Sequence, residues 1–291
     1  MAIHPRPHPG RSTVQLRNRM ILSARRIITE HWPRVDRCSI CGSAWPCPPT
    51  KTAYDYLATV GQATWAPILR DVEAVYLSYH PDLAAPDAPQ TVSAFTDLAV
   101  AAGVSRLVLL SGRGEESAQL AEKHVQSAGV KWTVLQSSWF NQNFSEGYLV
   151  EPVRDGEVVL PVGAVPEPFV DADDIAEVAV AALTGGGHAG QLYELTGPRL
   201  LTFGEAIAEI STVTGRTINF VPVSPEEYAG GLAAAGVPAT AVELLTHLFT
   251  TLLDGRNARV TDGVVRALGR PPRDFADYAE STAATGVWGR A

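Results

Sequence analysis

Four residues with metal-ligating side chains lie close together near the start of this 291-residue sequence. His31 precedes Cys38-x2-Cys41-x5-Cys47, and the chain has no other cysteine. Thiolates and imidazoles at such spacings are ligands of structural zinc, and zinc can order a segment too short to build its own core. The pattern predicts a small zinc knuckle. Because only one CxxC is present, three free thiols in a short leader are the alternative.

A second pattern with chemical meaning is Gly185-x-Gly187-x2-Gly190, which has the spacing of a dinucleotide-binding turn. Such a turn must follow a strand and open a helix, because its backbone N–H groups and the helix N-terminus face the pyrophosphate. Here the glycines follow an expected helix and precede an expected strand. We therefore interpret them as a loop that ends a helix.

Charge is unevenly distributed along the chain. Residues 1–62 carry nine basic and three acidic residues, whereas residues 63–291 carry 14 basic and 28 acidic residues. This asymmetry predicts two units, a basic leader and an acidic main domain. We interpret the basic stretch of the leader as a solvated helix face, so nucleic acid is not the expected partner.

The composition also indicates the cellular compartment in which the protein works. It is 46% hydrophobic, enough for a sizeable core, but no apolar run approaches the roughly 18 residues of a membrane span. The arginines near the start are not followed by the continuous apolar stretch of a secretory signal. Together with the clustered cysteines, these features predict a protein of the reducing cytoplasm.

Short apolar runs alternate with amphipathic stretches in the main domain, which predicts an α/β fold with a parallel sheet. The region from about 197 to 291 is expected to be mostly helical, and residues 1–62 to form helix, knuckle and helix without a strand. The expected strands are 74–79, 107–110, 132–135, 192–195 and 218–221, and the expected helices are 87–102, 115–128, 171–183 and 203–213.

Several runs occur in the order found in the NmrA-like atypical short-chain dehydrogenases. They are VYLSYHPDLAAP, AAGVSRLVLLSGRGEE, SAGVKWTVLQSSWFNQNF, PFVDADDIAEVAVAAL, YELTGP, LTFGEAIAEIS and ALGRPPRDFADY. Residues 64–291 resemble this family, above all its quinone-reductase-like and ergot-alkaloid-biosynthesis-type members. The resemblance implies a Rossmann-like sheet, NAD(P)H as cofactor and a quinone, enone or iminium-like small molecule as substrate. Residues 1–62 resemble short cysteine-bearing proteins of high-GC bacteria.

The resemblance also implies which residues line the cofactor site. They follow the expected parallel strands, at whose carboxyl ends open α/β sheets bind ligands. Trp139 and Phe140 could instead be core aromatics, His80 a surface histidine and Lys123 an exposed helix lysine. The implied set is Ser78, Tyr79, His80, Ser111, Gly112, Lys123, Ser138, Trp139, Phe140 and Asn143.

The chain departs from the family pattern in three ways. It has no Tyr-x3-Lys pair, so we assign no catalytic acid. Gln136-Ser137 stands where family members commonly have Arg-Pro, which weakens an expected polar contact. The first three strands and their phosphate-binding glycine turn are not found in residues 1–62, so we expect an incomplete Rossmann-like sheet. The strand 74–79 would then have an uncovered edge, through which the chain could self-associate.

Three hypotheses follow. The first is an NAD(P)H-dependent oxidoreductase that acts on a small molecule. The second is a cofactor-sensing regulator of NmrA type that does not turn over a substrate. The third is a fused or truncated product in which the zinc-knuckle leader replaces the phosphate-binding half and leaves the chain inactive. Ancestry favours the first hypothesis, and the missing glycine turn favours the third for the activity of this chain.

Overall fold

The computed structural model describes residues 33–34, 37–38, 65, 69–80 and 82–289. They belong to two compact units, one that reaches Arg70 and includes Ala235–Val237, and one that contains Asp71–Ala234 and the chain from Pro238 onward. Among the described residues, no helix is long and apolar enough to cross a membrane.

The described part of the first unit contains a short antiparallel ladder. Strand β1, Pro33–Arg34, pairs with β2, Arg37–Cys38. The expectation that residues 1–62 contain no strand was therefore wrong for these four residues. The physical reason is local: two residues separate the strands in the sequence, which is the shortest connection of a hairpin.

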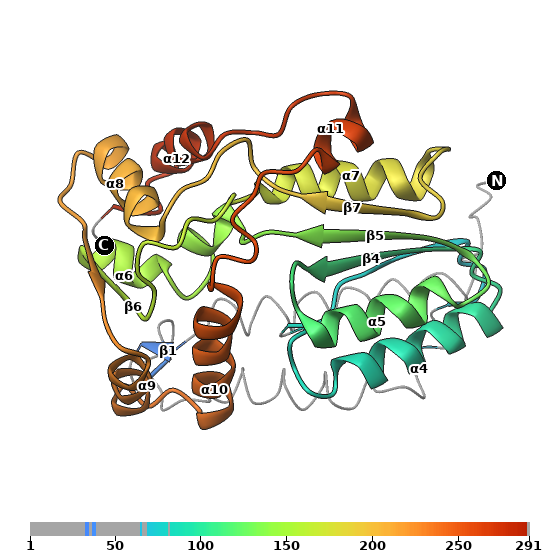
Figure 1. Cartoon of the computed structure of the whole chain (residues 1–291), viewed down its shortest axis with the longest axis horizontal. Coiled ribbons are helices and arrows are strands. Elements are labelled where there is room, and N and C mark those ends of the chain that lie inside the picture. Colours follow the sequence, from blue (N-terminus) through green and yellow to red (C-terminus); the bar gives the residue numbers. More distant parts are fainter. Residues whose placement is uncertain (1–32, 35–36, 39–64, 66–68, 81, 290–291) are drawn as a thin grey trace, which may run out of the picture. The chain divides into compact units, whose positions relative to one another are not determined.

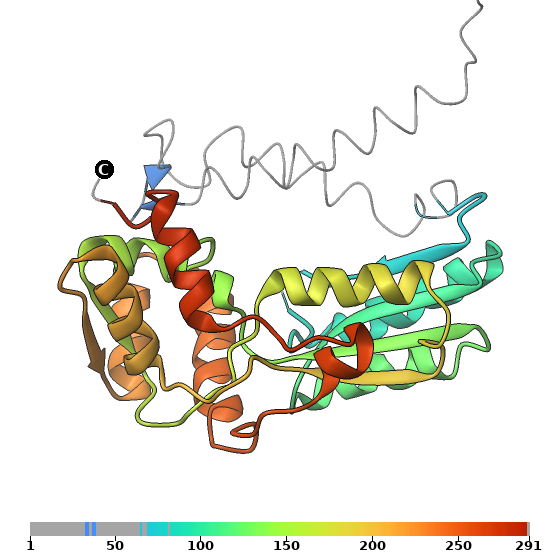
Figure 2. The same cartoon turned by 90° about the horizontal axis from the view of Figure 1, so that it is seen from above.

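The second unit is built on a four-stranded parallel sheet with the order β3-β4-β5-β7 (Figure 1). Helices α4 and α5 lie on one face of this sheet and α7 lies on the other (Figures 1 and 2). The predicted parallel α/β sheet is confirmed. Its strands are β3 Ala74–Leu77, β4 Arg106–Gly112, β5 Lys131–Ser137 and β7 Gln191–Leu195, and its helices are α4 Ala88–Ala101, α5 Glu116–Gln126 and α7 Ala172–Thr184.

Strand β3 lies at one end of the sheet. It pairs with β4 on one side, and no other strand among the described residues pairs with it. Tyr76, in the middle of β3, is 40% exposed. Unpaired N–H and C=O groups along a strand form a template for another strand. Self-association through this edge therefore stays a prediction.

The rest of the second unit lies beyond the carboxyl ends of the main strands (Figure 1). It contains a two-stranded parallel sheet of β6, Glu157–Leu160, and β8, Asn219–Pro222. The sequence predicted β8 but placed β6 in a loop region. The helices here are α6 Val150–Asp155, α8 Phe203–Thr214, α9 Pro225–Ala234, α10 Ala239–His247 and α12 Phe275–Ala284, with the π-helical turn η3 Leu248–Leu252 after α10. Helix α11, Gly263–Leu268, instead packs against α7 and β7 of the main sheet (Figure 1).

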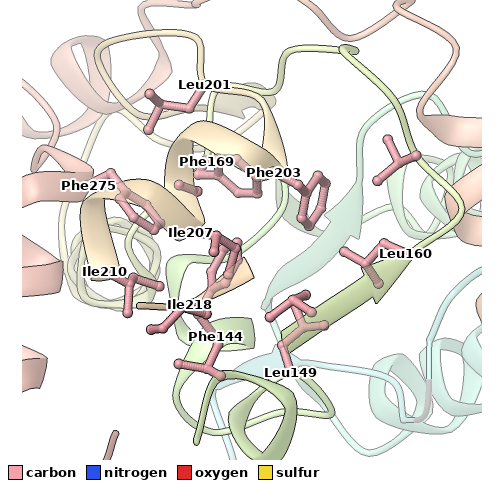
Figure 3. Packing of buried hydrophobic residues seen from close by; sticks show 14 of the residues in the cluster. Phe144, Leu149, Leu160, Phe169, Leu201, Phe203, Ile207, Ile210, Ile218 and Phe275 are labelled. Carbon is pink, nitrogen blue, oxygen red and sulfur yellow. The ribbon is translucent and has the colours of Figure 1, made fainter. Parts of the chain in front are cut away.

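An aromatic core holds this second region together (Figure 3). The ring of Phe144 lies 5.5 Å from that of Phe169, 5.9 Å from that of Phe203 and 5.4 Å from that of Phe275. Two of these contacts are edge-on, the geometry that aromatic quadrupoles favour. Because the four rings come from distant segments, the core fixes the region that faces the carboxyl ends of the sheet.

The glycines at 185, 187 and 190 form the connection from α7 to β7, as predicted. Gly187 and Gly190 have φ values of 86° and 73°, which L-residues with a side chain rarely adopt. The loop thus ends a helix and leads into a strand, and it lacks the order that a dinucleotide needs.

A buried carboxylate connects α7 to the C-terminal segment. Asp174 is fully buried and accepts hydrogen bonds from Arg270 Nη2 at 2.8 Å and from the backbone N–H of Arg273 at 2.7 Å. The guanidinium of Arg273 also pairs with it. Glu177, one turn further along α7, contacts the same two arginines from the exposed side.

We expect Asp174→Asn to lower the free energy of unfolding by about 3 kcal/mol, because it leaves two guanidinium groups without their buried counter-charge. The measurement is urea unfolding at neutral pH. Asp173→Asn, on the exposed face of the same turn, is the control and should cost far less, since it loses only a screened interaction with the helix N-terminus. Equal losses in both variants would contradict the assignment of Asp174 as an anchor.

Candidate functional site

The residues predicted after the first strand lie along one edge of the sheet. Ser78 and His80 are exposed, whereas Tyr79 is half-buried. Burial raises the pKa of Tyr79, and a hydrogen bond with Asp87 at the start of α4 raises it further. The Tyr79 hydroxyl is therefore directed to α4, while Ser78 and His80 remain accessible.

Ser111, near the end of β4, belongs to a buried polar cluster. Its hydroxyl donates to Glu122 Oε1 at 2.6 Å, and Gln136 Nε2 donates to both oxygens of Glu122 at 2.8 and 2.9 Å. The departure from Arg-Pro at Gln136-Ser137 therefore keeps a polar contact with a carboxylate, made by a neutral amide. Ser111 holds Glu122 in place at the end of the sheet.

Ser138 follows β5 and contacts a second buried carboxyl group. Its hydroxyl donates to Glu167 Oε2 at 3.2 Å, and Glu167 is fully buried in the loop before α7. Burial raises the pKa of Glu167 to about 7, although the Ser138 hydrogen bond and the positive charge of Arg113 oppose the rise. Arg113 itself pairs with Glu194 at 3.1 Å. Glu167 therefore titrates near neutral pH.

Trp139 and Phe140 are adjacent but belong to different cores. Trp139 packs against the aromatic core of the C-terminal region, and Phe140 packs against the core beneath the main sheet. Asn143 lies half-buried in the 3₁₀ turn η2, Asn141–Phe144, which follows directly. Of the two aromatic residues, only Trp139 contacts the region that faces the sheet's carboxyl ends.

The remaining predicted residues are not brought to this site. Lys123 lies on the exposed side of α5, next to the inward-facing Glu122. Three predicted zinc ligands, His31, Cys41 and Cys47, lie outside the described residues, and the fourth, Cys38, is described only in its backbone. Within the described residues, no group of three or more His, Cys, Asp or Glu could hold a metal ion.

Sequence reasoning missed a pair of carboxyl groups at the ends of β3 and β4. Burial, the negative charge of Asp82 and a hydrogen bond with Asp82 together raise the pKa of Glu115 to about 8. Burial also raises the pKa of Asp82, although a hydrogen bond from the backbone of Ala84 opposes the rise. Two carboxyls this close share a proton, because both cannot be charged at low cost. The signal in the sequence was an acidic residue in the connection between each strand and the helix that follows it.

A glycine makes room for this pair. A Cβ added at Gly112 would lie 2.0 Å from Glu115 Oε1, so the Glu115 carboxyl occupies the space that a side chain at position 112 would fill. Gly112 was predicted to line the cofactor site. The structure gives it a definite role, because any larger residue would displace Glu115.

An aromatic group lies near the carboxyl pair. The Phe249 ring in η3 lies 4.9 Å from that of Trp139, 6.0 Å from that of Tyr148 and 5.7 Å from that of Tyr228. The hydroxyl oxygen of Tyr148 is buried and has no hydrogen-bond partner in the described structure. Burial raises its pKa well above the usual value, and the charges of Tyr228 and Asp82 add to the rise. We call Trp139, Tyr148, Tyr228 and Phe249 the aromatic wall.

These groups fit one end of a nicotinamide dinucleotide. Buried polar atoms without a partner follow β4 and β5, and they could bind an amide and ribose hydroxyls. The pyrophosphate finds no such fit among the described residues, because Asp87 and Glu116, at the starts of α4 and α5, repel a phosphate. The unpartnered atoms are Glu115 Oε2, Ser137 Oγ, Asn141 Oδ1 and Nδ2, Tyr148 Oη and Glu167 Oε1.

Solved structures share the fold. An NADPH-dependent quinone oxidoreductase of Escherichia coli, solved with NADPH, has a TM-score of 0.66 at 17% identity, and the match covers 93% of this chain and 97% of that one. NmrA, a negative transcriptional regulator solved with NAD, has a TM-score of 0.50 at 18% identity and covers 77% and 80%. At these identities the likeness concerns the fold alone.

Similarity in sequence to known proteins shows the family to which the chain belongs. The NAD(P)H azoreductase of Xenophilus azovorans is 32% identical over 209 residues, which cover 68% of this chain and 72% of the azoreductase. Festuclavine synthase II of Penicillium roqueforti is 32% identical over 221 residues, with coverage of 73% and 75%. The chain belongs to the NmrA-like NAD(P)H-binding oxidoreductases. No family model matches the sequence.

In this NmrA-like protein, Gly112→Ala should move the Glu115 carboxyl into solvent and lower its pKa. A carboxyl whose folded pKa is about 8 and whose unfolded pKa is about 4.3 stabilises the fold at low pH, and this stabilisation is lost as pH rises through 8. The variant should therefore lose less stability between about pH 5 and pH 9 than the wild type. Urea unfolding across this range is the measurement.

Gly163→Ala is the control for this substitution, because nothing lies within 4 Å of a Cβ at that position. It should keep the wild-type dependence of stability on pH. If Gly112→Ala also keeps the wild-type dependence, then Glu115 does not occupy the space above Gly112.

Proposed function

We propose that this chain is an NAD(P)H-dependent reductase of a small, flat, unsaturated molecule, with its site at the carboxyl edge of the main sheet. The observation that carries the proposal is the pairing of two features there. A carboxyl pair at the ends of β3 and β4 lies near the aromatic wall, and the Asp82 charge acts on the Tyr148 hydroxyl of that wall. Aromatic side chains bind flat apolar molecules, and a protonated carboxyl can donate a hydrogen bond to them.

The cofactor, when bound, supplies a hydride, which the protein has to direct at the acceptor. The exposed Ser78, directly after β3, would bind a ribose hydroxyl. The unpartnered side chain of Asn141 would bind the carboxamide. The aromatic wall would hold the acceptor and exclude water, which strengthens every polar contact in the site.

The relatives support an unsaturated acceptor. Those reported above are named for the reduction of azo compounds and for festuclavine, and a structural neighbour is named for quinones. Azo compounds and quinones share an unsaturated, electron-accepting group within a flat framework. We therefore propose this class of substrate, without selecting one member.

A regulator that binds a cofactor without turnover is the second candidate. One finding favours it: NmrA, a negative transcriptional regulator solved with NAD, shares the fold. We also propose that the chain works in the cytoplasm. The zinc knuckle of His31, Cys38, Cys41 and Cys47 is a separate proposal for the first unit.

Titration of NADH and NADPH against the purified full chain separates these candidates. We expect binding that quenches tryptophan fluorescence, because Trp139 lies at the site, and oxidation of the bound cofactor on addition of a quinone or an azo compound. Binding without oxidation across such a panel would favour the regulator. No binding at millimolar cofactor would contradict both candidates.

We expect Trp139→Leu to raise the KM for the acceptor by about fivefold, because one aromatic contact contributes roughly 1 kcal/mol. The affinity for NAD(P)H should change much less. Trp132→Leu is the matched control, since Trp132 is also half-buried on β5 but lies at the opposite end of the strand. Similar kinetic effects from both variants would mean that Trp139 acts only through stability.

A further inference from the structure

Reduction of an acceptor needs a proton as well as a hydride, and the chain lacks the Tyr-x3-Lys pair that supplies it in many short-chain dehydrogenases. Three groups near the aromatic wall could carry a proton. Tyr148 is a poor donor, because burial raises its pKa well above the usual value. Glu167 is fully buried, and its carboxyl is already bound to Ser138. Glu115 is half-buried, and no described group donates a hydrogen bond to its Oε2 atom.

The position of Glu115 is set by its neighbours. Its carboxyl lies against Gly112 at the end of β4, in space that only a glycine leaves open. Glu115 is the N-cap residue of α5, but its side chain makes no capping hydrogen bond with the backbone N–H groups of the helix. Its Oε2 atom is buried and lacks a hydrogen-bond donor in the described structure. A carboxyl without donors is better accommodated in its neutral form.

The negative charges around Glu115 also favour the neutral form of its carboxyl group. Asp82, in the loop after β3, is hydrogen-bonded to Glu115, and Glu122 on α5 adds a second negative charge. The pKa of Asp82 is raised by burial, while Ala84, Glu115 and the positive charge of His80 oppose that rise. Asp82 is therefore the better acceptor of the two, and Glu115 holds the shared proton.

We propose that Glu115 is the proton donor of this reductase, with Asp82 as the residue that positions its proton. The inference rests on the proposed reductase function and adds to it the acid that sequence reasoning left unassigned. The geometric support is the space that Gly112 leaves for the Glu115 carboxyl, and the charge of Asp82 also acts on the buried, unpartnered Tyr148 hydroxyl of the aromatic wall.

The proposed step transfers one proton and no electrons. The O–H bond of Glu115 breaks, and a new O–H, N–H or C–H bond forms on the acceptor, which has received its two electrons with the hydride of the dihydronicotinamide. Glu115 is left as a carboxylate beside Asp82, and the repulsion between the two charges favours its reprotonation. Because Glu115 is half-buried, water can return the proton.

The test uses the purified full chain and the variants Glu115→Gln, Asp82→Asn and Glu116→Gln. Glu116 is the matched control, since it is the next residue and is exposed at the start of α5. Two readouts are needed. One is the pH profile of kcat/KM for an acceptor at saturating NAD(P)H. The other is the infrared carbonyl band of a protonated carboxylic acid, which is followed across pH without cofactor or substrate.

We expect the wild-type kcat/KM to fall above about pH 8, and Glu115→Gln to lower kcat at least about 100-fold and to remove this fall. The infrared band that titrates near pH 8 should be absent in Glu115→Gln and present in Glu116→Gln. Asp82→Asn should fold, and its kcat/KM should fall at a lower pH than that of the wild type, because the negative neighbour of Glu115 is gone.

The experiment distinguishes failure of the donor role from failure of the reductase function. Turnover with an unchanged pH profile in Glu115→Gln would overturn the donor role and leave the reductase function standing. A wild type that reduces no acceptor would overturn the proposed function together with the donor role, while the infrared titration would still report whether Glu115 holds a proton. If Glu115→Gln does not fold, an unshifted profile in Asp82→Asn overturns the proposal.

Discussion

Parallel pairing of four strands is the constraint on which the rest of this structure depends. In a parallel sheet all strands end at the same edge, so residues far apart in the sequence meet there without any contact between their own segments. Ser78, Ser111 and Ser138 follow or end β3, β4 and β5, and each reaches the edge for this reason alone. The second region, with its aromatic core, lies beyond that edge and can face it (Figure 1).

The carboxyl groups at this edge have an energetic cost. The carboxylate of Glu122 accepts hydrogen bonds from Ser111 and Gln136. Glu115 and Glu167, in contrast, each have a buried oxygen that accepts no hydrogen bond in the described structure. A fold optimised only for stability would not retain such groups, because an unpartnered buried polar atom costs about 1–3 kcal/mol. Polar groups held without partners are typical of sites that bind a ligand.

The sequence predicted the sheet well, because buried parallel strands and amphipathic helices have distinct periods. It placed β3, β4, β5 and β7 to within a few residues. It also predicted that the glycine loop before β7 is not a dinucleotide-binding turn. It missed β6, since a four-residue strand carries too little pattern. It also missed Glu115 and Asp82, because their chemistry arises from mutual proximity and burial, which one-dimensional spacing does not encode. Trp139 and Phe140 look equivalent in the sequence, and only the fold separates their environments.

The amide of Gln136 has a consequence for the choice of acceptor. Where family members commonly carry a guanidinium, this chain has a neutral group against Glu122, and the nearest buried cation, Arg113, is paired with Glu194. The edge therefore has more negative charge than positive charge to balance it. Discrimination between ligands depends on repulsion as much as on attraction. An acceptor bound at this edge in the proposed reaction would therefore be neutral or cationic rather than carboxylated or sulfonated.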